Sequence, residues 1–360
     1  MRIKSKAIKN FNSCEIRIEQ GALSTAGSLI KKKFSTSQLF VLTDSKGYKL
    51  YYKKLEKSVS KQRLRVTPII IPDGERYKNL DSLKKAYDRL VKEKADRQSL
   101  LVGLGGGVIG DLAGTVAATY MRGIPLVHIP TTLLAQADAS IGGKTALDLP
   151  QAKNLMGCFY PAQLVIIDPL VLKTLPKKDF LNGLVEIIKI GLVSNPKILN
   201  FVQKHYKEIL KKDIVYLQKL ISMAVVEKVN VTNLDPFDRG VRKILNFGHT
   251  FGHALETYKN YQKITHGEAV GLGILVALNL SQDLKLARDG LGPEIKQLFT
   301  EMGLPAQIKG LDLRKIWEIM NLDKKVKDGN VNFVLLKDIG KPILKAVNEK
   351  SFYKAAEIIL

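Results

Sequence analysis

The sequence predicts an α/β N-terminal domain with a mostly parallel sheet, followed by a mainly α-helical C-terminal domain. In the first 170 residues short apolar runs alternate with helical patterns, which is typical of βαβ units. Beyond residue 170, long segments carry apolar residues at helical spacing. The chain of 360 residues also exceeds the usual size of one domain. We therefore expect one domain at residues 1–170 and a second at 171–360.

The individual elements follow from the same patterns. Five apolar runs are predicted to be buried strands: 38–44, 66–72, 99–107, 125–132 and 163–168. A helix with an Asp at its start is predicted at 80–94. In the second half we expect helices at 179–192, 197–210, 217–233, 247–258, 268–285, 293–302 and 313–320. The run NFVLLKDIG at 332–340 predicts a short strand or hairpin arm.

Composition narrows the class of protein. The net charge is +23, but aromatic residues make up only 7% and the lysines are spread in pairs along predicted polar helix faces. Nucleic-acid binders concentrate charge and interleave it with aromatics, so we favour a solvated surface that attracts a small anionic substrate. Two cysteines cannot form a disulfide framework, the N-terminus lacks an apolar signal core, and no run would cross a membrane. We expect a cytoplasmic protein.

Three of the five histidines lie between residues 246 and 271. His249 and His253 are four residues apart and share one helix face, and His266 follows after a polar connection. Two histidines at this spacing, with no third nearby, are more often solvated than bound to a metal. A third imidazole close in the sequence favours a zinc site. Glu186, three residues before Lys189 on an apolar helix, supplies an oxygen that would complete the site with two of the histidines.

A glycine-rich run, GLGGGVIGD at 103–111, follows one predicted strand and opens a helix. Gly105, Gly107 and Gly110 have the GxGxxG spacing, which lets a pyrophosphate approach the backbone at a helix N-terminus. The acidic residue expected about 20 positions later is absent. Asp44, at the end of an earlier strand, would supply that carboxylate instead. The pattern indicates a Rossmann-like domain with an unusual arrangement.

Polar residues that suit an anionic substrate lie between residues 119 and 157. Four of them are expected in glycine-rich turns: Arg122, Lys144, Lys153 and Asn154. Asp138 and Asp148 add carboxylates suited to holding hydroxyl groups. Farther along, Lys228 and Arg242 would pair a substrate carboxylate, the arginine in bidentate fashion.

Taken together, these segments resemble a known family. GGGVIGDLAG, YMRGIPLVHIPTTLLAQADASIGGKTALD, KNLMG, GLVEIIK, LNFGHTFGHALE and THGEAVG occur in this order. The chain closely resembles the 3-dehydroquinate synthases over essentially its whole length. Related sugar-phosphate cyclases and glycerol-dehydrogenase-like enzymes share the architecture, but the GGKTALD and KN motifs are most similar to the dehydroquinate branch.

The resemblance implies a lyase of the shikimate pathway that depends on NAD and on zinc or cobalt. It would convert 3-deoxy-D-arabino-heptulosonate 7-phosphate to 3-dehydroquinate and phosphate, through transient oxidation, elimination, re-reduction and aldol closure. The implied metal ligands are Glu186, His249 and His266. The implied catalytic residues are His253, Asp238, Lys144 and Lys189. The implied substrate contacts are Arg122, Asp138, Lys144, Asn154, Lys189, Lys228, Arg242, Asn246 and His253. The implied NAD contacts are Asp44, Glu75, Lys78, Gly106, Gly107, Asp111, Thr131, Thr132, Lys153, Thr174 and Asn182.

Some positions depart from the family pattern, and some alternatives stay open. Asp238 stands where the family usually has Glu, and ADAS at 137–140 replaces a DSS-containing version. Lys324 or Lys325 resembles a late substrate contact. The family also suggests a homodimer in which Arg122 reaches across the interface. The alternatives are another sugar-phosphate cyclase and a metal- and NAD-dependent polyol dehydrogenase, which would accumulate NADH.

Overall fold

The computed structural model describes residues 1–5, 13–260, 264–322 and 330–360, and these form two compact units. The first unit contains Met1–Pro176 and Leu217–Phe237, and the second contains Lys177–Tyr216 and Asp238–Leu360. Helix α8 (Ile214–Leu234) therefore begins in the second unit and continues in the first. The division after residue 170 stays a prediction. No helix within the described residues is long and apolar enough to span a membrane.

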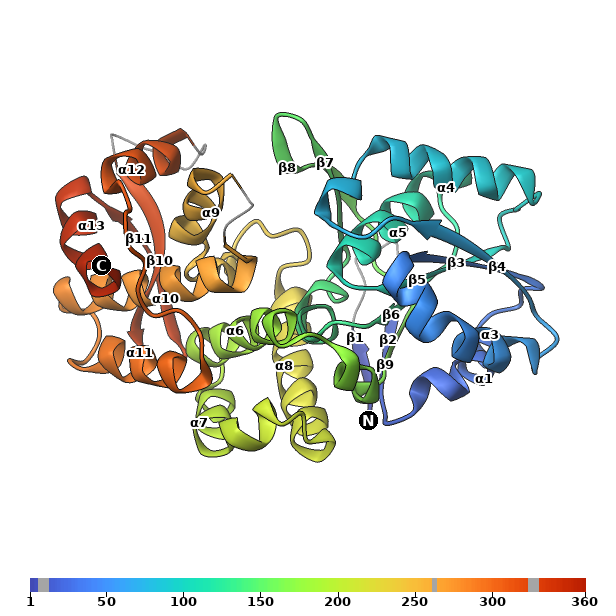
Figure 1. The fold of residues 1–360 in the computed structure, drawn as a ribbon, viewed down its shortest axis with the longest axis horizontal. Helices are drawn as coiled ribbons and strands as arrows, with labels where there is room; N and C mark the ends of the chain where they lie inside the picture. Colours follow the sequence, from blue (N-terminus) through green and yellow to red (C-terminus); the bar gives the residue numbers. More distant parts are fainter. Residues whose placement is uncertain (6–12, 261–263, 323–329) are drawn as a thin grey trace. The chain divides into compact units, whose positions relative to one another are not determined.

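The first unit is organised around a seven-stranded sheet with the order β1-β2-β9-β6-β5-β3-β4 (Figure 1). Only β1 is antiparallel to its neighbour. The central strands β5 and β6 are buried along their whole length, as expected for parallel strands covered on both faces. The strands are β1 (Arg2–Ser5), β2 (Cys14–Ile18), β3 (Gln38–Asp44), β4 (Arg65–Ile71), β5 (Leu100–Gly105), β6 (Leu126–Pro130) and β9 (Leu164–Ile167).

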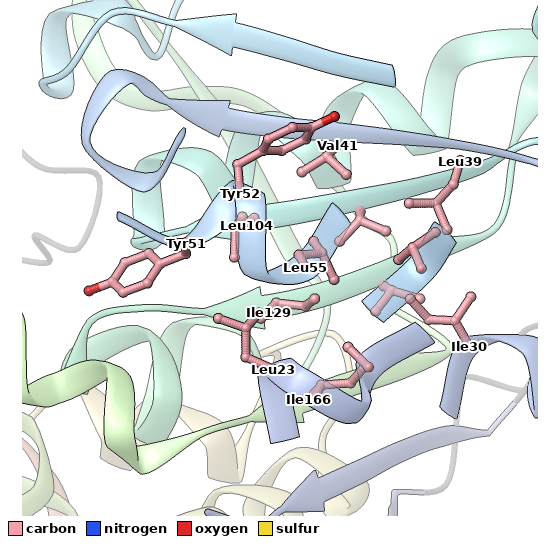
Figure 2. Close-up of a cluster of buried hydrophobic side chains, with 14 of the residues drawn as sticks. Leu23, Ile30, Leu39, Val41, Tyr51, Tyr52, Leu55, Leu104, Ile129 and Ile166 are labelled. Carbon is pink, nitrogen blue, oxygen red and sulfur yellow. The ribbon is translucent and has the colours of Figure 1, made fainter. Parts of the chain in front are cut away.

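Helices cover both faces of this sheet. One face packs against α1 (Ala22–Lys33) and α3 (Lys53–Ser60) in a core that includes Leu39, Leu55 and Ile129 (Figure 2). Leu100, Val102 and Leu104 of β5 belong to that core, so its alternate residues face the other side. There a Cβ on Gly103 would lie 2.9 Å from Ala113 of α5 (Gly107–Thr119). Helix α4 (Leu80–Lys92) packs beside α5.

The strand order reverses between β3 and β5, and this places two predicted site elements together. The chain goes from β3 outward to β4 and returns to β5 on the other side of β3. The Thr43 hydroxyl donates to the Leu104 carbonyl at 2.7 Å, which joins the carboxyl ends of the two strands. Asp44 follows Thr43 and caps the short helix α2 (Ser45–Gly47). Ligands of open parallel sheets bind at such a reversal.

A hairpin of β7 (Lys144–Leu149) and β8 (Ala152–Phe159) lies against α5, where a Cβ on Gly114 would be 2.3 Å from Thr145 Cγ2. The prediction that Lys144, Lys153 and Asn154 lie in turns was wrong, because all three are in strands. Every residue of strand β8 is exposed or half-buried. It therefore lacks the alternation of apolar and polar residues that reveals a strand in a sequence.

The second unit is mainly helical, with one antiparallel hairpin. Helix α10 is buried on nearly all sides because it packs against α6, α9, α11, α13 and the hairpin. The elements are α6 (Lys177–Val193), α7 (Pro196–Leu210), α9 (His249–Tyr258), α10 (His266–Asp283), α11 (Leu291–Met302), α12 (Leu313–Leu322), β10 (Val331–Asp338), β11 (Lys341–Val347) and α13 (Glu349–Ala356). The predicted fold class is confirmed, and the seven helices predicted in the second half end within a few residues of those observed.

Candidate active site

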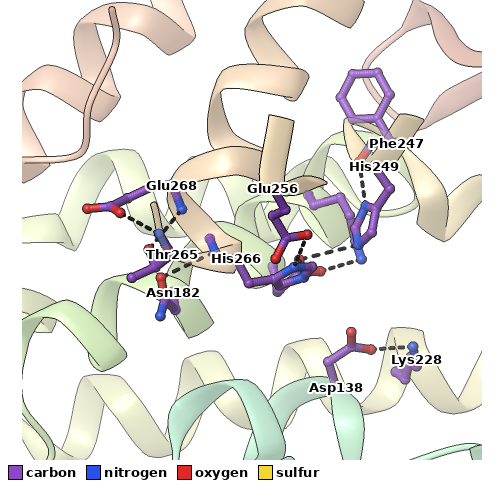
Figure 3. A network of polar contacts seen from close by, with 12 residues as sticks. Asp138, Asn182, Lys228, Phe247, His249, Glu256, Thr265, His266 and Glu268 are labelled. Carbon is purple, nitrogen blue, oxygen red and sulfur yellow. Dashed lines mark hydrogen bonds and ion pairs between the residues drawn. The ribbon is translucent and has the colours of Figure 1, made fainter. Parts of the chain in front are cut away.

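Three helices of the second unit bring together the predicted metal ligands. Glu186 lies within α6. His249 and His266 are the first residues of α9 and α10 (Figure 3). Glu186 Oε1 is 3.6 Å from His249 Nε2 and 3.3 Å from His266 Nε2. Lys189 joins them through an ion pair with Glu186 Oε2. We call Glu186, Lys189, His249 and His266 the Glu186 cluster.

Glycine contacts hold these helices close enough for the ligands to meet. A Cβ on Gly267 would lie 2.4 Å from Asn182 Cα of α6, and a Cβ on Gly273 would lie 2.0 Å from the Gly248 carbonyl oxygen. The Gly267 N–H also donates to Asn182 Oδ1 at 3.2 Å. Thr265 and Glu268 form a capping box at the start of α10, which fixes the backbone of His266. The spacing of glycines after His266 thus has a packing reason.

The charges within the Glu186 cluster favour a ligand role for Glu186 and His249. Burial raises the pKa of Glu186, but the Lys189 ammonium and the two imidazoles outweigh it, so the net pKa is well below the usual range. Burial lowers the pKa of His249 far enough to keep it neutral. Because His249 Nδ1 is 3.1 Å from the Phe247 carbonyl oxygen, which only accepts, its proton lies there and Nε2 carries the lone pair.

The pKa of His266 is shifted in the opposite direction from that of His249. Burial lowers its pKa, but the nearby carboxylates of Glu186 and Glu256 overcome this and raise the pKa to about 10. A proton then occupies the space where Nε2 faces Glu186. A metal ion would replace that proton, as in other sites whose ligands must be deprotonated.

The residues of the Glu186 cluster fit a divalent metal ion. One carboxylate oxygen and two imidazole nitrogens, from Glu186, His249 and His266, all lie within 4.8 Å of one another. Glu186 Oε1 is buried and makes no hydrogen bond with a described residue. This donor set suits zinc or cobalt and leaves coordination positions for a substrate. His253 is exposed and belongs to a second group of possible ligands, with Glu256 and His266. Its predicted role at the substrate stays a prediction.

The predicted dinucleotide loop begins where β5 enters α5. Gly106 and Gly107 start the helix, and a Cβ on Gly106 would lie 3.0 Å from Thr132 Cγ2. The Thr131 N–H donates to the Gly105 carbonyl at 2.9 Å, which holds the β6 end beside the loop. Helix α5 therefore presents its N-terminal amides at the carboxyl edge of the sheet, where a pyrophosphate would bind.

A second group of charges surrounds Lys78, and we call Glu75, Lys78, Asp111, Asp148 and Asn154 the Lys78 cluster. Lys78 Nζ is 3.2 Å from Glu75, 3.2 Å from Asp111 and 3.5 Å from Asp148, and it donates to Asn154 Oδ1. Burial raises the pKa of Asp111 to about 6, although Lys78 opposes this. Burial lowers the pKa of Lys78, but the carboxylates outweigh it and the net pKa is raised. The predicted NAD contacts Glu75, Lys78 and Asp111 thus lie beside a predicted substrate contact, Asn154.

Two further predicted residues form a pair in the first unit. Lys228 of α8 makes an ion pair with Asp138, although separate roles were predicted for them (Figure 3). Thr174, a predicted NAD contact, donates to the Val171 carbonyl at 2.9 Å and also lies against the Tyr51 hydroxyl.

The remaining predicted residues are placed individually. Arg122, Asn154 and Asp238 have φ angles of 66°, 55° and 56°, which non-glycine residues adopt uncommonly. Arg242 is buried in the turn Val241–Asn246, which Asn246 ends. The predicted substrate contacts are divided between the units: Arg122, Asp138, Lys144, Asn154 and Lys228 lie in the first, and Lys189, Arg242, Asn246 and His253 in the second. Lys324 and Lys325 lie outside the described residues.

Two residues in these regions were not predicted to belong to a site. Glu256 is buried on α9 and lies 3.3 Å from His266 Nδ1. Glu256 is seven residues after His249, so the two share one helix face, and this spacing could have placed Glu256 near the metal site from the sequence. His128 of β6 lines a small hollow beneath the glycine loop together with Gly103, Gly110 and Ser140. No pattern in the sequence distinguished it from the apolar residues of its strand.

Comparison with known proteins identifies the family. Residues 68–182 match the family model of the 3-dehydroquinate synthase N-terminal domain, and residues 183–326 match that of the C-terminal domain. The 3-dehydroquinate synthase of Citrifermentans bemidjiense is 40% identical over 337 residues, which cover 94% of this chain and 93% of that protein.

Solved structures agree on the fold. A 2-epi-5-epi-valiolone synthase from Streptomyces hygroscopicus with NAD+ and Zn2+ bound has a TM-score of 0.88 at 23% identity, over 97% of each chain. A 2-deoxy-scyllo-inosose synthase complexed with carbaglucose-6-phosphate, NAD+ and Co2+ has a TM-score of 0.86 at 24% identity, over 100% of each chain. With both family models matched in order and close relatives over nearly its full length, the chain belongs to the 3-dehydroquinate synthase family.

Proposed function

We propose that this chain converts 3-deoxy-D-arabino-heptulosonate 7-phosphate to 3-dehydroquinate and inorganic phosphate, using NAD and a divalent metal. The observation that carries the proposal is the meeting of Glu186, His249 and His266 donor atoms in a chain 40% identical to a 3-dehydroquinate synthase. When bound, the metal supplies Lewis acidity toward a substrate hydroxyl and NAD accepts and returns a hydride. The chain's own residues bind and orient the substrate around them.

The ion pairs seen without ligand support specific roles. The two carboxylate oxygens of Glu186 have different partners. Oε2 forms an ion pair with Lys189, and Oε1 faces the imidazoles of His249 and His266. Lys189 therefore contacts a proposed metal ligand directly. From this position its ammonium can donate to a hydroxyl of a substrate bound at the metal. Lys228 and Asp138 are largely buried and neutralise each other. A substrate carboxylate would replace Asp138 as the partner of Lys228, and a substrate hydroxyl would donate to the released Asp138.

The remaining assignments belong to the same proposal. The substrate phosphate is bound by Arg122, Lys144 and Asn154. The carboxylate end of the substrate is bound by Arg242 and Asn246. Proton transfer is assigned to His253 and Asp238. The NAD contacts come from the glycine loop and its surroundings, and they are Asp44, Glu75, Lys78, Gly106, Gly107, Asp111, Thr131, Thr132, Lys153, Thr174 and Asn182. Asn182 also holds the start of α10. Exposed Arg122 suits a contact to a second copy in a homodimer, and two free thiols suit the cytoplasm.

The decisive experiment follows phosphate release from the heptulosonate phosphate with zinc-loaded protein and catalytic NAD. We expect turnover with no lasting NADH absorbance. Absence of phosphate release by fully metallated protein would overturn the proposal. Accumulation of NADH with a polyol would instead indicate a dehydrogenase. Preference for a sugar phosphate that lacks the carboxylate would indicate another cyclase.

Zinc binding tests the ligand assignment separately from turnover. His249→Ala and His266→Ala should lose zinc, because each removes one of three protein donors. His253→Ala should keep zinc and lose turnover. Equal loss of the metal in all three variants would show that His253 is also a ligand.

A further inference from the structure

His266 has a carboxylate at each of its two ring nitrogens. Nε2 is 3.3 Å from Glu186 Oε1, and Nδ1 is 3.3 Å from Glu256 Oε2 (Figure 3). Glu256 comes from α9, the helix that also carries His249, and it is 7% exposed. Helices α9 and α10 are held at close range by Gly273 against Gly248, so this contact is built into the packing.

The chemistry of a neutral imidazole gives this contact a direction. The ring carries one N–H and one lone pair, and a carboxylate only accepts. A proton on Nδ1 directed at Glu256 leaves the Nε2 lone pair directed at the position between His266 and Glu186. A carboxylate partner also makes the metal-binding nitrogen more basic. Glu256 therefore selects the tautomer that metal binding requires.

We propose that Glu256 is a positioning residue that fixes the tautomer and ring orientation of His266 so that Nε2 binds the metal. The inference rests on the metal site proposed above. His249 has a different arrangement, because its Nδ1 lies 3.1 Å from the Phe247 backbone carbonyl. The two histidine ligands are thus oriented by different acceptors, one neutral and part of the backbone, the other charged and removable by substitution.

A rival use of the same atoms is a second ion held by His253, Glu256 and His266, whose donor atoms also lie within 4.8 Å of one another. That arrangement would take the lone pair of His266 Nδ1. Both ring nitrogens would then bind metal, and the imidazole would have to lose both protons. His253 is also exposed, whereas Glu186 is 1% exposed. The positioning role is therefore favoured.

Zinc affinity measured by chelator competition tests the proposal without use of turnover. Glu256→Gln has the same shape but no charge, and it should weaken zinc binding about 10-fold, with Glu256→Ala nearer 100-fold. Glu301→Gln, on α11 and exposed, is the matched control and should bind zinc as the wild type does. Each protein should bind one zinc ion per chain. Far-UV circular dichroism of the apo proteins checks that the isosteric Gln variant is folded.

Nitrogen NMR of histidine-labelled protein reports the tautomer directly. In the zinc-loaded wild type the His266 signals should show a protonated Nδ1 and a metal-bound Nε2, and in Glu256→Ala they should show mixed tautomers. Wild-type affinity in both Glu256 variants would overturn this inference. Two zinc ions per chain, falling to one in Glu256→Ala, would overturn it in favour of a second ion. Wild-type zinc affinity in His249→Ala would instead overturn the proposed metal site.

Discussion

The Lys78 cluster and the Glu186 cluster both gather charges around one buried group, but their compositions are opposite. Around Lys78, three carboxylates and an amide oxygen surround a single ammonium. Around Glu186, one ammonium and two imidazoles surround a single carboxylate. The first cluster pairs donors with acceptors within the protein. In the second, the Nε2 lone pair of His249 faces the Glu186 oxygen, so two acceptors meet.

This difference separates a group whose charges are balanced within the protein from a group that requires a metal ion. Two facing acceptors are unfavourable unless a cation lies between them, which is what a metal ion provides. The Lys78 cluster needs no added ion. The following substitutions test whether the two clusters differ in this way, beginning with the largest expected effect.

Lys78→Met should reduce the free energy of unfolding of the apo protein by about 3 kcal/mol, because three partly exposed carboxylates would lose the buried cation that they share. Urea unfolding measures this. Lys84→Met is the matched control, since Lys84 pairs with Asp88 on the exposed side of α4 and should leave the midpoint unchanged. If the two variants unfold at the same urea concentration, Lys78 does not stabilise the first unit.

His128 is a buried imidazole that lies outside both groups of possible metal ligands among the described residues. Burial lowers its pKa from 6.5 to about 4. The unfolded chain therefore takes up a proton near pH 6.5 and the folded chain only near pH 4, so stability falls as the pH drops through this range. His128 accounts for roughly 3 kcal/mol of that loss.

His128→Leu removes this contribution. Unfolding free energies of apo wild type and variant, measured from pH 7 to pH 4, should differ by an amount that changes by roughly 3 kcal/mol across the range. The difference isolates His128 because every other titrating group is shared. Parallel curves for the two proteins would show that the imidazole is not buried as described.

Much of the fold was predictable because the periodic spacing of apolar residues in the sequence indicates which face of a helix or strand is buried. The long helices of the second unit were found in this way. The strand β8 was missed because none of its residues is buried, so no alternation of buried and exposed residues marks it.

The residues of the candidate site were harder to predict than the fold from local sequence patterns. Glu186 and His249 are far apart in the chain, and only the family resemblance selected His249 and His266 from three histidines. Helical spacing treats His253 and Glu256 alike as neighbours of His249. What distinguishes Glu256 is the orientation of the His266 ring, which depends on contacts such as Gly273 against Gly248.

Gly273→Ala tests those contacts. Its Cβ would lie 2.0 Å from the Gly248 carbonyl oxygen, so α9 and α10 would have to separate. We expect a loss of about 1–3 kcal/mol in unfolding free energy, with weaker zinc binding because His249 moves relative to His266. Gly271→Ala is the control on the same helix, since its nearest contact would be 3.5 Å from Phe299. Equal behaviour of the two variants would contradict the packing argument.

The smallest effect compares the helix caps beside the two clusters. Asn79 caps α4 next to Lys78, and Thr265 caps α10 next to His266. Each substitution by Ala should cost about 1 kcal/mol of unfolding free energy. Only Thr265→Ala should also weaken zinc binding, by a few-fold, because fraying the start of α10 loosens His266. Chelator competition and urea unfolding on both variants measure this, and a zinc affinity reduced equally in Asn79→Ala would show that the two clusters are not functionally distinct.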